Sequence, residues 1–72
     1  MPARFSNLKR ALEKLGLTVT PPNGGSHWRA MLNGKTYPIP AHHGDKTEIS
    51  EKYIRGVCDC FHLKLEDLRK LL

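Results

Sequence analysis

The sequence predicts an α+β fold in which helices cover one face of a three-stranded antiparallel sheet. Three observations predict it: an amphipathic helical pattern at the start, a hairpin signal in the middle, and a second helical pattern over the last third. A chain of 72 residues buries only one small core, so we expect residues 1–72 to form a single domain.

The first third of the chain predicts one helix and one strand. The helix covers residues 5–15, because apolar residues recur there three and four apart, namely Phe5, Leu8, Leu12 and Leu15. Gly16 follows as a C-terminal stop. Residues 17–20 alternate and include β-branched side chains, which predicts a short strand, and the Pro-Pro-Asn-Gly-Gly stretch after them predicts a loop.

A β-hairpin is predicted around Asn33-Gly34, because a type I′ turn needs positive φ at both central residues. The turn fixes the register of strands 27–32 and 35–40, which pairs Leu32 with Lys35, Ala30 with Tyr37, Trp28 with Ile39 and His27 with Pro40. The core face then carries Trp28, Ala30, Leu32, Tyr37 and Ile39, and the open face carries His27, Arg29, Met31 and Thr36. The prolines at 38 and 40 place the second hairpin strand at the sheet edge, since they lack an N–H.

The last third predicts a polar loop and two helices. Residues 41–46 form the loop, and Ser50 is an expected N-cap for a helix that runs to about Phe61. Residues 65–72 predict a short third helix, with acidic residues in its first turn and basic residues near its end.

Charge and composition limit the classes of function. Twelve Lys and Arg residues against seven acids give a net charge of +5, which favours an anionic partner such as nucleic acid; the alternative is that the charge only maintains solubility. No stretch approaches the ~20 apolar residues of a membrane span, and no signal-peptide pattern opens the chain. We therefore expect a cytoplasmic protein without a membrane partner. Cys58 and Cys60 are expected to be reduced thiols, because positions two apart on a helix cannot pair.

His27 is the candidate catalytic residue, because the hairpin register places it on the open face beside a glycine turn. If the last strand extends to residue 42, His42 lies diagonal to it, at roughly 7–8 Å between backbones. Two imidazoles at that distance can act as general base and general acid on one phosphodiester. The groups expected to bind RNA around them are Gly25, Ser26, Arg29, Lys35, His42 and Lys46.

Simpler interpretations stand beside these. A histidine is often just an exposed polar side chain, which stays open for His27 and is favoured for His43 and His62. Cys58, Cys60 and His62 suggest zinc, but no Cys-x-x-Cys pair is present, so we expect no metal site. Trp28 is expected in the core rather than stacked on a base, and the helix basic cluster of Lys9, Arg10 and Lys14 is expected to be a solvated face.

Short motifs, in order along nearly the whole chain, resemble the HicA toxins, the mRNA-cleaving members of bacterial and phage toxin–antitoxin pairs. The matching segments are residues 8–16 (first helix and closing glycine), Gly25-Ser26-His27 (the Gly-Ser-His motif), residues 39–42 (Val/Ile-Pro-x-His), Lys46 with residues 48–49, and residues 53–55. The sequence departs from the family at Trp28, where a second histidine is frequent. Its loop at 41–47 is one residue longer, which leaves open whether His42 or His43 assists His27.

The resemblance implies a double-stranded-RNA-binding-domain-like α-β-β-β-α fold, here with a short further C-terminal helix. It also implies a metal-independent endoribonuclease that cleaves mRNA with His27 as catalytic residue and needs no small-molecule cofactor. A HicB-type antitoxin protein is the implied partner. Two other classes of function fit the same charge: a non-catalytic RNA-binding module of the same fold, and a domain that binds an acidic protein.

Overall fold

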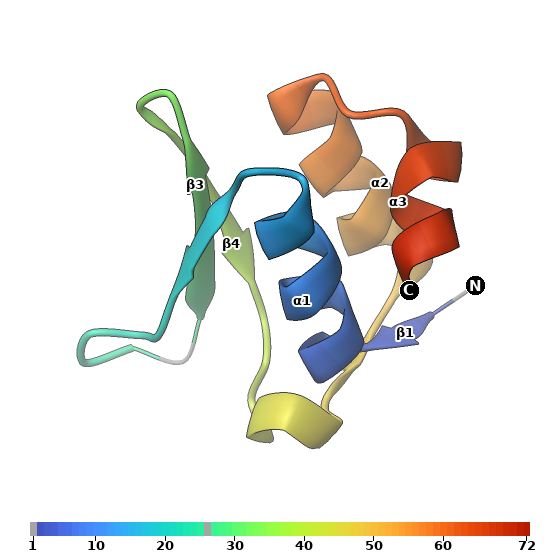
Figure 1. Ribbon diagram of the computed structural model, residues 1–72. Helices are drawn as coiled ribbons and strands as arrows, with labels where there is room; N and C mark the ends of the chain where they lie inside the picture. The colour runs from blue at the N-terminus through green and yellow to red at the C-terminus, as the bar shows by residue number, and fades with distance from the viewer. Residues whose placement is uncertain (1, 26) are drawn as a thin grey trace.

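The computed structural model describes residues 2–25 and 27–72 and shows an α+β fold (Figure 1). Its elements are β1 (Ala3–Arg4), α1 (Phe5–Lys14), β2 (Thr18–Thr20), β3 (Trp28–Leu32), β4 (Lys35–Ile39), the 3-10 turn η1 (Gly44–Lys46), β5 (Glu48–Ile49), α2 (Glu51–Phe61) and α3 (Leu65–Leu71). The antiparallel sheet has the order β2-β3-β4, and the helices lie together on one side of it. The expected α-β-β-β-α order with a short C-terminal helix is confirmed.

The hairpin has the register that its turn predicts. Trp28 pairs with Ile39, Ala30 with Tyr37 and Leu32 with Lys35. The strands end at Trp28 and Ile39, so the predicted pair of His27 with Pro40 does not form part of the ladder. The two turn residues have φ values of 52° and 82°, as a type I′ turn requires. β4 lies at the sheet edge, as its two prolines indicate.

The two faces of the sheet differ in burial as expected. Ala30 and Ile39 are fully buried, whereas Arg29, Met31 and Thr36 are exposed. The buried face packs on α1, where the ring centroids of Phe5 and Trp28 are 4.8 Å apart. Trp28 therefore packs against the core, as predicted, although it stays partly buried. The core is completed by apolar residues of the three helices, chiefly Leu8, Leu12, Ile54, Val57, Phe61 and Leu68.

α1 ends as Gly16 predicts. The N–H of Gly16 donates to the carbonyl of Glu13 at 3.1 Å, and the N–H of Leu17 donates to the carbonyl of Leu12 at 3.0 Å. These two bonds form a Schellman motif that satisfies carbonyls at the end of the helix. They also direct the chain from α1 straight into β2.

Three local features depart from the sequence predictions or add to them. Residues 41–46 are not only a loop, because η1 lies within them. β1 and β5 form a further antiparallel pair, in which Ala3 lies opposite Ile49. The sequence does not predict this pair, because a strand of two residues is too short to show an alternating pattern. Ser50 occupies the N-cap position of α2, but its side chain makes no capping hydrogen bond.

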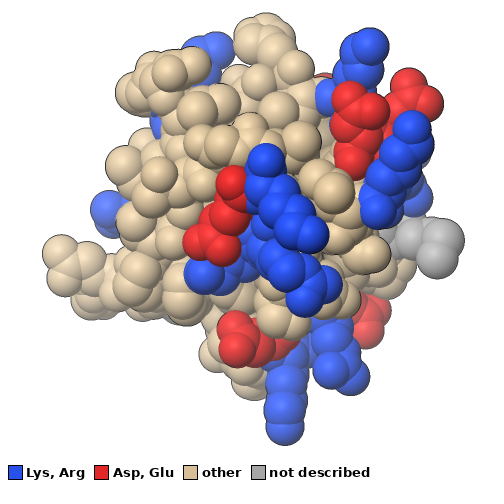
Figure 2. All heavy atoms as spheres, in the orientation of Figure 1, with Lys and Arg blue, Asp and Glu red and all other residues tan. Residues whose placement is uncertain are grey.

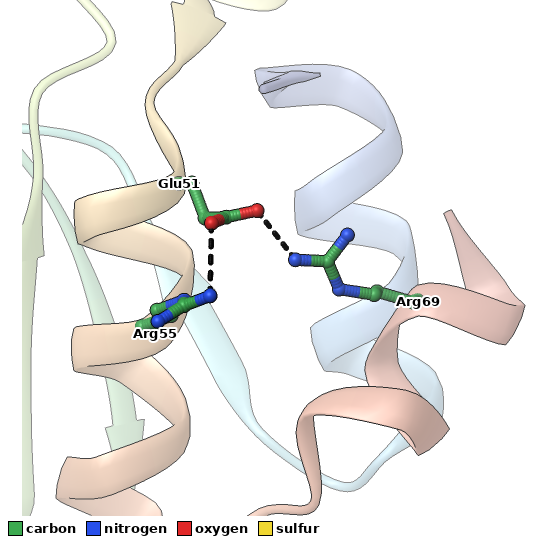
Figure 3. Close-up of polar contacts among 3 residues, drawn as sticks. All are labelled: Glu51, Arg55 and Arg69. Carbon is green, nitrogen blue, oxygen red and sulfur yellow. Dashed lines mark hydrogen bonds and ion pairs between the residues drawn. The ribbon is translucent and has the colours of Figure 1, made fainter. Parts of the chain in front are cut away.

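An ion-pair cluster joins α2 to α3. In Figure 3 the carboxylate of Glu51 lies between the guanidinium groups of Arg55 and Arg69. Nη2 of Arg55 is 3.1 Å from Glu51 Oε2, and Nη2 of Arg69 donates to Glu51 Oε1. The cluster fixes the short third helix against the start of the second. Within residues 2–25 and 27–72, no helix has the length and apolar character that crossing a bilayer requires.

Candidate active site

The rings of His27 and His42 lie edge to face, with their centroids 5.4 Å apart and their planes at 82°. His27 directly precedes β3, and His42 lies in the turn that follows β4. Both residues are exposed. The sequence predicts His42 near His27 only if the last strand extends to residue 42. That extension is wrong, because β4 ends at Ile39. A turn rather than a strand brings the second imidazole to the first.

The turn that carries His42 is held on both sides. Ala41 is 5% exposed, and its N–H donates to the carbonyl of Ile39 at 2.9 Å. The N–H of His43 donates to Oγ1 of Thr47 at 2.7 Å, and the carbonyl of Thr47 accepts the N–H of Phe5 at 2.8 Å. The loop is thus tied to the start of α1, beneath which η1 lies in Figure 1. With its neighbour Ala41 buried, His42 is left on the outside.

The two adjacent histidines, His42 and His43, are placed differently. The ring that lies against His27 is that of His42. His43 contributes its backbone N–H to the loop, and its residue is exposed. The sequence alone leaves this choice open because the two residues are adjacent and chemically identical.

The other predicted site residues divide into two groups. Arg29 follows His27 by two positions on the open face, and Lys46 closes η1; both are exposed, as is Gly25. Ser26 lies outside the described residues. Lys35 is the first residue of β4, opposite Leu32 at the turn end of the hairpin. It is therefore about 16 Å along the strand from His27, at ~3.3 Å per residue, and the structure does not bring it to the histidine pair.

The hairpin sheet carries no acidic residue. All seven acids fall at or before position 13 or at or after position 45, namely Glu13, Asp45, Glu48, Glu51, Asp59, Glu66 and Asp67. Figure 2 shows red carboxylates among blue side chains over the helices and η1, and none over the part of the hairpin in view. The net charge alone does not reveal this segregation, although the positions of the acids in the sequence do.

The alternative sites considered from the sequence do not form. Among the described residues, no group of three or more His, Cys, Asp or Glu side chains is placed to hold a metal ion. Cys58 is buried and Cys60 is partly buried, and both are free thiols. Burial, followed by the charge of Asp59, raises the pKa of Cys58 above its usual value. Lys9 pairs with Glu13 at 3.0 Å, in line with a solvated helix face.

The arrangement can perform acid–base chemistry on a phosphodiester. Two imidazoles stand side by side on an exposed surface, and histidine is the side chain whose ordinary pKa suits both proton removal and proton donation near neutral pH. Arg29, exposed and two residues after His27, supplies a positive charge nearby in the chain. No family model, curated protein or solved structure matches this chain.

Proposed function

We propose that this protein is an endoribonuclease toxin of the HicA type that cleaves mRNA with His27 and His42. The observation that carries the proposal is the close pair of exposed imidazoles, 5.4 Å apart, at the position of the Gly-Ser-His motif. The α-β-β-β-α order that the resemblance implies supports it, as does the net charge of +5.

The reaction needs two proton transfers, and each histidine carries out one of them. One imidazole removes the proton of a ribose 2′-hydroxyl, and the freed oxygen attacks the adjacent phosphorus. The bond from phosphorus to the 5′-oxygen breaks, and the other histidine, as imidazolium, gives its proton to that oxygen. The products are a 2′,3′-cyclic phosphate and a 5′-hydroxyl end, so no water, metal or cofactor enters this step.

Positive charge stabilises the transition state of this step. Arg29, exposed and two residues after His27, is proposed to contact the phosphate oxygens, and Lys46 lies in the loop that also carries His42. Backbone N–H groups around Gly25 and Ser26 are proposed as further donors, which the Gly-Ser-His motif supports.

The cellular setting follows from the resemblance. We propose that the protein acts in the cytoplasm, that its substrate is mRNA, and that a HicB-type antitoxin protein neutralises it. A second open reading frame beside its gene, encoding a small acidic protein that abolishes cleavage when added, is the expected companion.

Cleavage of RNA by the purified protein in EDTA tests the proposal. We expect wild type to release 2′,3′-cyclic phosphate ends, and His27→Ala and His42→Ala to lower the rate by about 10²–10⁴-fold. His43→Ala is the matched control, because it removes an adjacent exposed imidazole, and it should retain the wild-type rate. Wild-type cleavage by His27→Ala would overturn the assignment.

One observation favours a second candidate function. The acid-free sheet suits a non-catalytic RNA-binding module as well as a nuclease. The same assay separates the two, because a module binds the RNA and leaves it intact.

A further inference from the structure

A hollow opens on the outer face of the sheet, at the turn end of the hairpin. Its volume is about 310 Å³, and Thr18, Met31, Lys35 and Thr36 contribute to its lining. Three of these residues form a row across the strands, since Met31 pairs with Thr18 on one side and with Thr36 on the other. The hollow is thus a feature of the regular sheet surface, at the opposite end from the histidine pair.

A continuous row of side chains connects this hollow to the histidines. Within β3, Arg29 lies two residues before Met31 and two residues after His27, which directly precedes the strand, and it pairs with Thr20 and Pro38 of the neighbouring strands. Successive rows on one face are about 6.6 Å apart, so the hollow lies roughly 13 Å from His27. An extended polynucleotide covers that distance with a few nucleotides.

The chemistry of the face matches a single RNA strand. Arg29 supplies positive charge on this face, and Lys35, which pairs with Leu32 and so starts from the other face, lines the hollow at the turn end. No carboxylate occurs between residues 14 and 44 to oppose these charges. Among the described residues, Met31 is the exposed large apolar side chain, at 39%, and the hydroxyl of Thr20 contacts its sulfur at 3.8 Å. A thioether makes favourable contacts with an aromatic ring, and threonine hydroxyls can form hydrogen bonds with base edges.

We infer that this face is a binding track for single-stranded RNA, with Arg29 on a phosphate near the scissile one and the hollow holding a nucleobase a few nucleotides away. The position of the scissile phosphate rests on the proposed function; the track itself rests on charge, geometry and the hollow. A single strand is the suitable occupant because its bases are free to turn into a pocket, whereas a duplex keeps them stacked. Lys35 then contacts the RNA at the hollow instead of at the histidines.

Binding of a non-cleavable RNA tests the track. The probe is a fully 2′-O-methylated single strand of eight nucleotides, titrated against wild type, Lys35→Ala, Met31→Ala and Lys64→Ala. Lys64 is the matched control, because it is an exposed lysine just before α3. We expect Lys35→Ala to weaken binding several-fold and to reduce the slope of log K against log salt by about 0.7. Met31→Ala should weaken binding by about two- to tenfold, and Lys64→Ala should bind as wild type does.

The outcomes separate this inference from the proposed function. Equal affinity of all four proteins, or no binding by wild type, overturns the track, and the latter result would favour a protein partner for this face. If the octanucleotide binds with the expected dependence on Lys35 but wild type cleaves no RNA, the track stands and the ribonuclease proposal fails.

Discussion

Gly56 shows how the absence of a side chain at one position lets two elements pack closely together. A Cβ at this position of α2 would lie 1.9 Å from the hydroxyl oxygen of Tyr37 on β4, so only glycine lets the helix approach the hairpin this closely. Alanine would gain about 1 kcal/mol from helix propensity, but the overlap costs about 1–3 kcal/mol. We expect Gly56→Ala to lower the free energy of unfolding measured in urea.

Removing the phenol identifies the cause of that loss. In a Tyr37→Val background the added methyl group has space, so Gly56→Ala should there be neutral or stabilising. Equal destabilisation in both backgrounds would contradict the contact and point to another role for this glycine.

The two thiols should differ in reactivity, because only a thiolate is alkylated. Cys58 is 4% exposed, and burial raises its pKa, so it holds less thiolate at any given pH than an exposed cysteine. We expect iodoacetamide at pH 8 to modify Cys60 in the folded protein and Cys58 only after unfolding. In the Cys60→Ser variant Cys58 is the remaining thiol, so mass spectrometry of this variant measures the modification rate of Cys58 alone. Rapid modification in native buffer would disprove the burial of Cys58.

At the scale of the element, the hairpin depends on its turn. Gly34 has a φ of 82°, where an L side chain is strained, so Gly34→Ala should destabilise the fold by about 1–2 kcal/mol. Gly25→Ala is the control, because no left-handed φ is required there and nothing lies within 4 Å of the added carbon; its effect should stay within about 0.5 kcal/mol. Similar thermal unfolding midpoints for the two variants would contradict a turn-controlled register.

The loop of residues 41–47 should control the placement of His42. Thr47→Val removes the hydroxyl that accepts the N–H of His43, while it preserves the shape of the side chain. We expect the kcat for RNA cleavage to fall by about ten- to a hundredfold, as a displacement of about 1 Å allows, with little change in KM. Ser50→Ala should have no such effect, because that hydroxyl makes no capping bond. An unchanged kcat in Thr47→Val would show that the loop positions His42 without this bond.

The elements that sequence predicts well are those whose signal is local. The register of β3 and β4 follows from two turn residues, and α1 follows from the periodicity of its apolar side chains. The pairing of β1 with β5 cannot be predicted in this way, because two-residue strands far apart in the chain carry no periodic signal. The meeting of His27 with His42 was predicted through a longer strand, yet a turn held by tertiary hydrogen bonds achieves it.

At the scale of the whole molecule, charge is divided between two layers. Every acidic side chain lies outside the hairpin sheet, in the helices, η1 and β5, where Glu13 pairs with Lys9 and Glu51 with Arg55 and Arg69. The hairpin sheet has only cationic and neutral side chains. The sequence contains this division as a long stretch without acids. Only the fold shows that the stretch forms one sheet, with the histidine pair at one end and a hollow at the other.

The pH dependence of RNA cleavage tests the central claim most directly. If one imidazole must be neutral and the other protonated, the kcat/KM of wild type is bell-shaped, falling at low pH as the base is protonated and at high pH as the acid loses its proton. His42→Ala should lose one limb of the bell along with most of the rate, and His43→Ala should keep both. A His42→Ala variant with the wild-type rate and both limbs would contradict the account.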